Sequence, residues 1–111
     1  MRLMIHQVDD FAFEDQVLCA RGPVLVEFFT SSCGSCRQIE PHLQKLAQRF
    51  QGKLKVVKVN SDQSAQTAMI YKIKVAPTFI LFLNGEIKSV IQGAPPINRL
   101  VLLAESWSLK S

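Results

Sequence analysis

The pattern of apolar and polar residues divides the chain into alternating strands and helices. Strands are predicted by continuous runs of β-branched and aromatic residues, or by apolar residues alternating with polar ones. Five segments carry such patterns, at residues 4–8, 24–29, 54–60, 78–83 and 86–92. Asn84-Gly85, between the last two, is typical of a tight hairpin turn. The segment at 24–29 has the strongest pattern and is expected to be buried on both faces.

Apolar residues spaced three or four positions apart predict helices between these strands. The predicted helices cover residues 11–20, 34–50, 62–71 and 97–107, the third having the weakest pattern. Asp9 and Asp10 can cap the first helix. Pro41 lies inside the second helix and is expected to bend it, since its ring removes one backbone hydrogen bond. The alternation indicates an α/β chain with a parallel half and a terminal antiparallel hairpin.

Composition narrows the class of protein. A chain of 111 residues, 48% hydrophobic and 20% charged, is expected to form one ordered domain over residues 1–111. The formal charge is +4, but the basic residues are scattered, so nucleic-acid binding is not expected. The first ten residues lack the apolar core of a signal peptide, and no apolar run is long enough to span a bilayer. We therefore expect a cytoplasmic protein with no membrane association.

Two cysteines lie where the strand at 24–29 gives way to the long helix. Cys33 is expected at the helix start, where unpaired N–H groups and the helix dipole favour a thiolate over a thiol. The pKa of a cysteine in such a place can fall from about 8.5 to roughly 3.5–7.5. Cys36 follows one turn later, close enough to form a short disulfide with Cys33. In a reducing compartment a single CxxC indicates redox or metal chemistry.

Several short motifs accompany the CxxC at characteristic separations. In order they are Glu27-Phe28-Phe29, Cys33-Gly34-x-Cys36, Pro41, Val57-Lys58-Val59-Asn60, Tyr71-x-Ile73-x-Val75-Ala76-Pro77-Thr78, Asn84-Gly85 and Gly93. With these motifs the chain resembles the thioredoxin family over nearly its whole length. The resemblance implies a thioredoxin fold, a central mixed five-stranded sheet flanked by about four helices, and dithiol–disulfide exchange. It also implies a cis peptide bond between Ala76 and Pro77.

The chain departs from the family pattern at three positions around the cysteines. Thioredoxins usually have Trp before the first cysteine and Pro before the second, whereas this chain has Ser32 and Ser35. The buried acid of the family is usually Asp, and Glu27 occupies that position here. Ser32 removes a large contact surface. Ser35 offers an amide and a hydroxyl that Pro lacks, and both can stabilise a thiolate, which would make the pair more oxidising.

Position and resemblance together predict a role for each residue of the site. Cys33 is the expected nucleophile that attacks a substrate disulfide, and Cys36 the residue that resolves the mixed disulfide. By resemblance Glu27 is the base for the Cys36 thiol, with Lys58 near enough to tune the charge of Glu27. The alternative for Glu27 is purely structural, as an acid within an apolar strand that is simply paired with Lys58.

The resemblance also implies a binding surface and partners. Ala76, Pro77 and Gly93, with Gly34 and Ser35, would form the surface that binds an extended substrate peptide through backbone hydrogen bonds. The expected partners are protein disulfides and a thioredoxin reductase that supplies electrons. The chain is expected to act as a monomer and without a cofactor other than its redox-active disulfide.

Two other classes of function remain open at this point. The chain could be a thioredoxin-fold binding or scaffold module whose thiols are incidental. It could instead bind zinc through the CxxC, although a structural zinc needs four ligands and no second CxxC or His pair is present. No metal ligand is therefore predicted. Arg37 is expected to be either a solvated residue or a small help to the thiolate. The remaining candidates are expected to be bystanders or core residues: Cys19, His6, His42, Phe28, Phe29, Phe79, Phe82 and Trp107.

Overall fold

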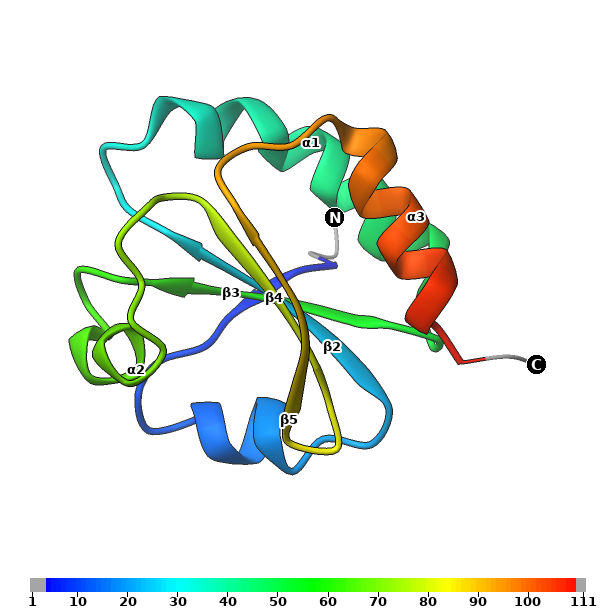
Figure 1. Ribbon diagram of the computed structural model, residues 1–111, viewed down its shortest axis with the longest axis horizontal. Coiled ribbons are helices and arrows are strands. Elements are labelled where there is room, and N and C mark those ends of the chain that lie inside the picture. Colours follow the sequence, from blue (N-terminus) through cyan, green and yellow to red (C-terminus); the bar gives the residue numbers. More distant parts are fainter. Residues whose placement is uncertain (1–3, 110–111) are drawn as a thin grey trace.

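A mixed five-stranded sheet forms the centre of the computed structural model, which describes residues 4–109 (Figure 1). In chain order the elements are β1 (His6–Gln7), η1 (Glu14–Leu18), β2 (Pro23–Phe29), α1 (Gly34–Arg49), β3 (Lys55–Asn60), α2 (Ala65–Ile70), β4 (Thr78–Leu83), β5 (Glu86–Gln92) and α3 (Ile97–Trp107). The strand order is β1-β3-β2-β4-β5. β1, β3 and β2 are parallel, and β4 and β5 are antiparallel to their neighbours. This is the predicted parallel half with a terminal hairpin, so the predicted fold class is confirmed.

Helices cover both faces of the sheet (Figure 1). α1 and α3 pack on one face, where Leu43 and Leu100 meet sheet residues such as Phe79 in one hydrophobic core. η1 lies on the other face, where its Val17 joins a second core that includes Phe28. β2 contributes to both cores because successive side chains of a strand point to opposite faces. Its first six residues are buried, as the sequence predicts.

The first predicted strand and helix are the parts that differ most from expectation. The strand predicted over 4–8 is reduced to β1, because this edge segment pairs only with β3. The helix predicted over 11–20 is a five-residue π-helix, with a hydrogen bond from Cys19 N to Glu14 O. The spacing of apolar residues correctly indicated that one face of this segment is buried, but it did not distinguish a π-helix from a regular α-helix.

Asp9 and Asp10 do not act together as the predicted cap. Asp9 Oδ1 accepts a 2.9 Å hydrogen bond from Ala12 N, in the turn before η1. Asp10 instead binds α2, accepting 2.9 Å and 2.6 Å hydrogen bonds from the amide and hydroxyl of Thr67. Asp10 therefore satisfies an amide in the first turn of a different helix, 57 residues further along the chain.

Most of the remaining expectations are confirmed. Asn84 and Gly85 have φ values of 53° and 80°, the left-handed conformations that a type I′ hairpin turn requires. Trp107 packs against the core beneath α3. Four phenylalanines were expected in the core. The prediction is wrong for Phe29, which lies at the end of β2 and is only partly buried. No helix among residues 4–109 is long and apolar enough to cross a membrane.

Candidate active site

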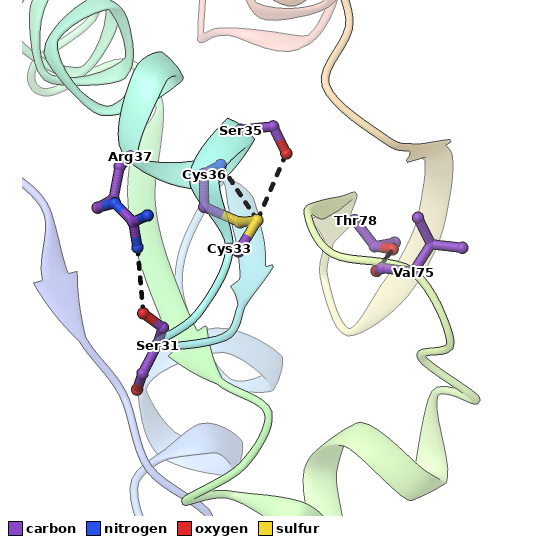
Figure 2. The surroundings of a disulfide bond; sticks show 7 residues. All are labelled: Ser31, Cys33, Ser35, Cys36, Arg37, Val75 and Thr78. Carbon is purple, nitrogen blue, oxygen red and sulfur yellow. Dashed lines mark hydrogen bonds between the residues drawn. A yellow bond between two sulfur atoms is a disulfide. The ribbon is translucent and has the colours of Figure 1, made fainter.

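Cys33 and Cys36 form a disulfide at the N-terminus of α1, with their Cα atoms 5.3 Å apart (Figure 2). Cys33 is the N-cap residue of this helix, and its Sγ accepts a 3.1 Å hydrogen bond from the amide of Cys36. This is the place that a Ser or Asp oxygen takes in an ordinary N-cap. The sulfur of Cys33 thus lies at the positive end of the helix dipole, as predicted.

The two residues between the cysteines differ in what they contact. Gly34 begins α1 and is exposed. The Ser35 hydroxyl lies 3.4 Å from Cys33 Sγ (Figure 2). Within the described chain the amide that reaches this sulfur belongs to Cys36, so the expected contribution of the Ser35 amide is not observed in the disulfide form. Of the two donors that Ser35 has and proline lacks, the hydroxyl is therefore the one that lies near the Cys33 sulfur.

Hydrogen bonds anchor the loop that leads from β2 into the cysteine turn. Arg37 Nη1 donates a 3.2 Å hydrogen bond to the carbonyl oxygen of Ser31, so its guanidinium is turned back toward the loop (Figure 2). Asn60, at the end of β3, donates through Nδ2 to Ser31 Oγ at 3.2 Å. Sequence reasoning missed the contribution of Ser31 and Asn60, since neither carries a recognisable chemical function.

The loop before β4, which contains Ala76 and Pro77, lies beyond the same ends of the strands as the cysteine turn. Phe28, near the end of β2, pairs with Thr78, the first residue of antiparallel β4, which places the loop before β4 beside the cysteine turn (Figures 1 and 2). The Ala76–Pro77 peptide bond is cis, as the resemblance implies. The carbonyl oxygen of Pro77 accepts a 2.7 Å hydrogen bond from Gly93 N. This bond ties the loop to the end of β5.

The backbone around Pro77 is only partly available to a partner. The Pro77 carbonyl is occupied by Gly93, and the Val75 carbonyl accepts from the Thr78 hydroxyl (Figure 2). The amide and carbonyl of Ala76 have no hydrogen-bond partner within residues 4–109. Of the predicted surface, Ala76 therefore offers the unused backbone groups, while Pro77 and Gly93 fix its shape.

Glu27 is a buried acid on the α1 face of β2. Its side chain is 1% exposed, and Oε2 has no hydrogen-bond partner within the described residues. Burial, followed by the negative charge of Glu40, raises the pKa of Glu27 to about 7, against the opposing charge of Lys58. A cavity of about 150 Å³ lies between β2, β3 and α1, and both Glu27 and Cys36 line it. The acid and the second cysteine therefore share one cavity.

Lys58 is beside Glu27 in the sheet but is bound to a different acid. The two residues are register partners in the parallel β2–β3 pair. Lys58 Nζ lies 3.3 Å from Glu40 Oε1, and no Glu27–Lys58 ion pair occurs in the described part of the chain. The purely structural interpretation of Glu27, as the partner of Lys58, is therefore not supported. Sequence reasoning missed Glu40, although its position four residues after Cys36 puts it on the same face of α1.

The other candidates lie outside this site. Cys19 is exposed and free, and His6 and His42 are exposed on β1 and α1. No group of three His, Cys, Asp or Glu side chains among residues 4–109 is arranged to hold a metal ion.

A redox-active cysteine pair at the start of a helix, next to a buried acid and a cis-proline loop, defines a thiol–disulfide oxidoreductase. Comparison with known proteins gives the family. The family model described as Thioredoxin matches residues 4–106. The chain belongs to the thioredoxin family, whose members are protein-disulfide reductases.

Individual relatives agree with this assignment. The chain is 42% identical to Thioredoxin 1 of Nostoc sp. over 90 residues, which cover 81% of this chain and 84% of that protein. It is 38% identical to a thioredoxin of Synechocystis sp. over 101 residues, 91% of this chain and 94% of the relative. It is also 41% identical to chloroplastic Thioredoxin M2 of Arabidopsis thaliana over 92 residues, 83% of this chain and 50% of that protein.

Replacing Ser35 by Pro is expected to lower the reduction potential of the cysteine pair by a few tens of millivolts. The hydroxyl near Cys33 Sγ can donate to the thiolate of the reduced form, and proline cannot. A charge-assisted hydrogen bond contributes about 1.5–3 kcal/mol before losses to solvent, and 1.4 kcal/mol corresponds to about 30 mV for this couple. Equilibration against a glutathione or dithiothreitol buffer measures the potential.

The Ser35→Ala variant separates the hydroxyl from the backbone. It removes the hydroxyl and keeps the amide, so it should lower the potential by about as much as Ser35→Pro. A drop in Ser35→Pro alone would show that the amide or the fixed φ of proline is responsible. An unchanged or higher potential in both variants would exclude Ser35 as a determinant of the redox potential.

Proposed function

We propose that this chain reduces disulfide bonds in other proteins, with Cys33 as the attacking and Cys36 as the resolving cysteine. The observation that carries the assignment is the position of Cys33 Sγ, at the N-cap of α1 and hydrogen-bonded by the Cys36 amide. The same amide can donate to a thiolate in the reduced form, which makes Cys33 the better nucleophile at neutral pH.

The reaction proceeds in two displacements. The Cys33 thiolate attacks one sulfur of the substrate disulfide, and the other substrate sulfur leaves as a thiolate. The Cys36 thiol then loses its proton and attacks Cys33 Sγ. This step forms the Cys33–Cys36 disulfide and releases the second substrate sulfur. Two electrons pass from the cysteine pair to the substrate, and the reaction needs no cofactor beyond the pair itself.

In this proposal Glu27 accepts the proton of the Cys36 thiol. Both residues line the same cavity, and a carboxyl with a pKa of about 7 can both take and release a proton at neutral pH. The released substrate thiolate is the group that finally receives the proton. Lys58 tunes the charge of Glu27 from the neighbouring strand.

An extended substrate segment would bind beside the disulfide. The unused amide and carbonyl of Ala76 can pair with such a segment as one strand pairs with another. Pro77 and Gly93 hold this loop, and the exposed Gly34 with Ser35 forms the opposite wall. Ser32, exposed where relatives of this family usually have Trp, leaves the surface next to Cys33 open.

We further propose that a thioredoxin reductase returns the disulfide to the dithiol, and that the chain works as a cytoplasmic monomer. A reducing compartment is compatible with the exposed free thiol of Cys19. The edge strand β5 carries the charged residues Glu86 and Lys88, which oppose edge-to-edge pairing of two copies.

Single-cysteine variants test the assigned roles. In a reduction assay with insulin and dithiothreitol, Cys33→Ser and Cys36→Ser should both fall to the background rate. Mixed with insulin after the dithiothreitol has been removed, only reduced Cys36→Ser should accumulate a covalent mixed disulfide with the substrate, detected by mass spectrometry, because it still carries the attacking thiol. Cys19→Ser is the matched control and should keep full activity.

Two results would contradict this proposal. A mixed disulfide formed by Cys33→Ser through Cys36 would reverse the two roles. A double variant that reduces insulin as fast as the unmodified protein would show that the thiols are incidental, as in a thioredoxin-fold binding module.

A further inference from the structure

Lys58 lies between two carboxylates and is bound to only one of them. Glu27 in β2 and Lys58 in β3 are register partners, so their side chains leave the sheet on the same face, beneath α1. From α1, Glu40 reaches down to the same place, and its Oε1 lies 3.3 Å from Lys58 Nζ. The ammonium group is also 5.2 Å from the centre of the Phe29 ring. Glu27 Oε2, by contrast, is buried without a hydrogen-bond partner in the described chain.

We propose that Glu40 is a positioning residue of the exchange reaction: its carboxylate holds the Lys58 ammonium at the rim of the cavity, away from the Glu27 carboxyl. This inference rests on the proposed role of Glu27 as the proton acceptor. The side chains of Lys58 and Glu40 are 27% and 30% exposed, so their ion pair lies toward solvent. Glu40 Oε1 also accepts a 3.0 Å hydrogen bond from Gln44 Nε2, which fixes the carboxylate on α1.

No other charged side chain that lines the cavity takes the place of Lys58 or Glu40. The charged residues that line the cavity are Glu27, Arg37, Glu40 and Lys58. The Arg37 guanidinium is turned toward the Ser31 carbonyl (Figure 2). On the β4 side, Glu27 is paired with Phe79, which carries no charge. Of the two cations that line the cavity, Lys58 is therefore the one whose position relative to Glu27 is set by Glu40.

The position of Lys58 decides whether Glu27 can exchange protons at neutral pH. An ammonium in direct contact would lower the pKa of the carboxyl by about 1–3 units and keep it ionised throughout the neutral range. Glu27 would then be a weak acceptor for the proton of Cys36. With Lys58 held by Glu40, burial and the charge of Glu40 outweigh the attraction of Lys58, and the pKa of Glu27 is about 7. Glu27 can then take the proton from the Cys36 thiol and give it to the departing substrate thiolate.

The direct test is the titration of Glu27 in the oxidised protein, followed by the ¹³C chemical shift of its labelled carboxyl group. Glu40→Gln removes the ion pair and should lower the pKa of Glu27 by about 1 unit or more, because Lys58 is released toward Glu27. In the Lys58→Met background the same substitution should have a clearly smaller effect. Glu105→Gln is the charge-matched control: Glu105 lies in α3 and pairs with Arg49 at the last residue of α1, so this variant should leave the titration of Glu27 unchanged.

The titration and the kinetics distinguish this inference from the proposed function. An unchanged titration in Glu40→Gln, or an equal shift with and without Lys58, overturns the positioning role of Glu40 but leaves the roles of the cysteines intact. In rapid-mixing experiments the pH midpoint for resolution of the mixed disulfide should move with the titration, toward acid in Glu40→Gln. If Glu27→Gln leaves the resolution rate and its pH profile unchanged, the base role of Glu27 fails, and with it the catalytic meaning of Glu40.

Discussion

Replacing Glu27 by Gln is expected to raise the free energy of unfolding at pH 8 by about 3 kcal/mol and to change it little at pH 4. Burial raises the pKa of this carboxyl from 4.5 to about 7 in the folded protein. Between these two values the folded state binds more protons than the unfolded state. The stability that the protonated carboxyl contributes is complete below pH 4.5 and is lost as the pH rises through about 7. Gln has nearly the same shape and cannot ionise, so its variant does not lose this stability.

Urea unfolding of the oxidised protein at several pH values between 4 and 8 measures the difference. Glu86→Gln is a suitable control, because the Glu86 side chain is 74% exposed, so this substitution should change the free energy of unfolding by less than about 1 kcal/mol. A Glu27→Gln variant whose advantage does not grow with pH would show that Glu27 is already ionised, or already compensated, in the folded protein.

Replacing Phe28 by Ala is expected to lower the free energy of unfolding by about 3–5 kcal/mol. Phe28 is fully buried in β2, within a cluster of aromatic rings. Its ring centre lies 6.5 Å from that of Phe13 and 6.3 Å from that of Tyr71, which come from different parts of the chain. Removing the ring leaves a cavity where the turn before η1, the loop after α2 and the sheet meet, and a close-packed interior collapses only partly around such a cavity.

Phe11→Ala is the matched control for this prediction. Phe11 is 98% exposed, so the same substitution should change the free energy of unfolding by less than about 0.5 kcal/mol. Urea or thermal unfolding of both variants provides the comparison. A loss below about 1.5 kcal/mol in Phe28→Ala would mean that the neighbouring rings repack into the space.

The parts of the fold that the sequence predicted well are those that depend on the order of apolar, polar and turn residues within a short segment. The strands at 78–83 and 86–92 have the predicted bounds, because an apolar run and an Asn-Gly turn define both ends of the hairpin. The start of α1 next to the first cysteine was also predicted from local pattern, because apolar residues recur at helical spacing from this point on. The cis Ala76–Pro77 bond came only from resemblance to a family, since both isomers of an X–Pro bond are accessible to the sequence alone.

What sequence did not predict depends on contacts between distant segments. Asp10 looked like a cap for the helix that follows it, but its carboxylate is bound by Thr67. The sequence analysis assigned no role to Glu40, because nothing in the sequence says which strand residue lies beneath it. Lys58 was expected to act on Glu27, and only the structure shows that Glu40 holds it.

The hydrogen bonds between Asp10 and Thr67 also make a short helix dependent on a distant segment of the chain. α2 has only six residues, too few to persist as an isolated helix in water. A helix of this kind gains its stability from the rest of the protein, and part of that support comes from the carboxylate of Asp10, 57 residues earlier in the chain. The order of α2 therefore depends in part on the amino-terminal segment that packs beside it. Removal of the first ten residues would therefore delete the edge strand β1 and would also take a hydrogen-bond acceptor from a helix that begins 55 residues after Asp10, next to the loop that carries Pro77.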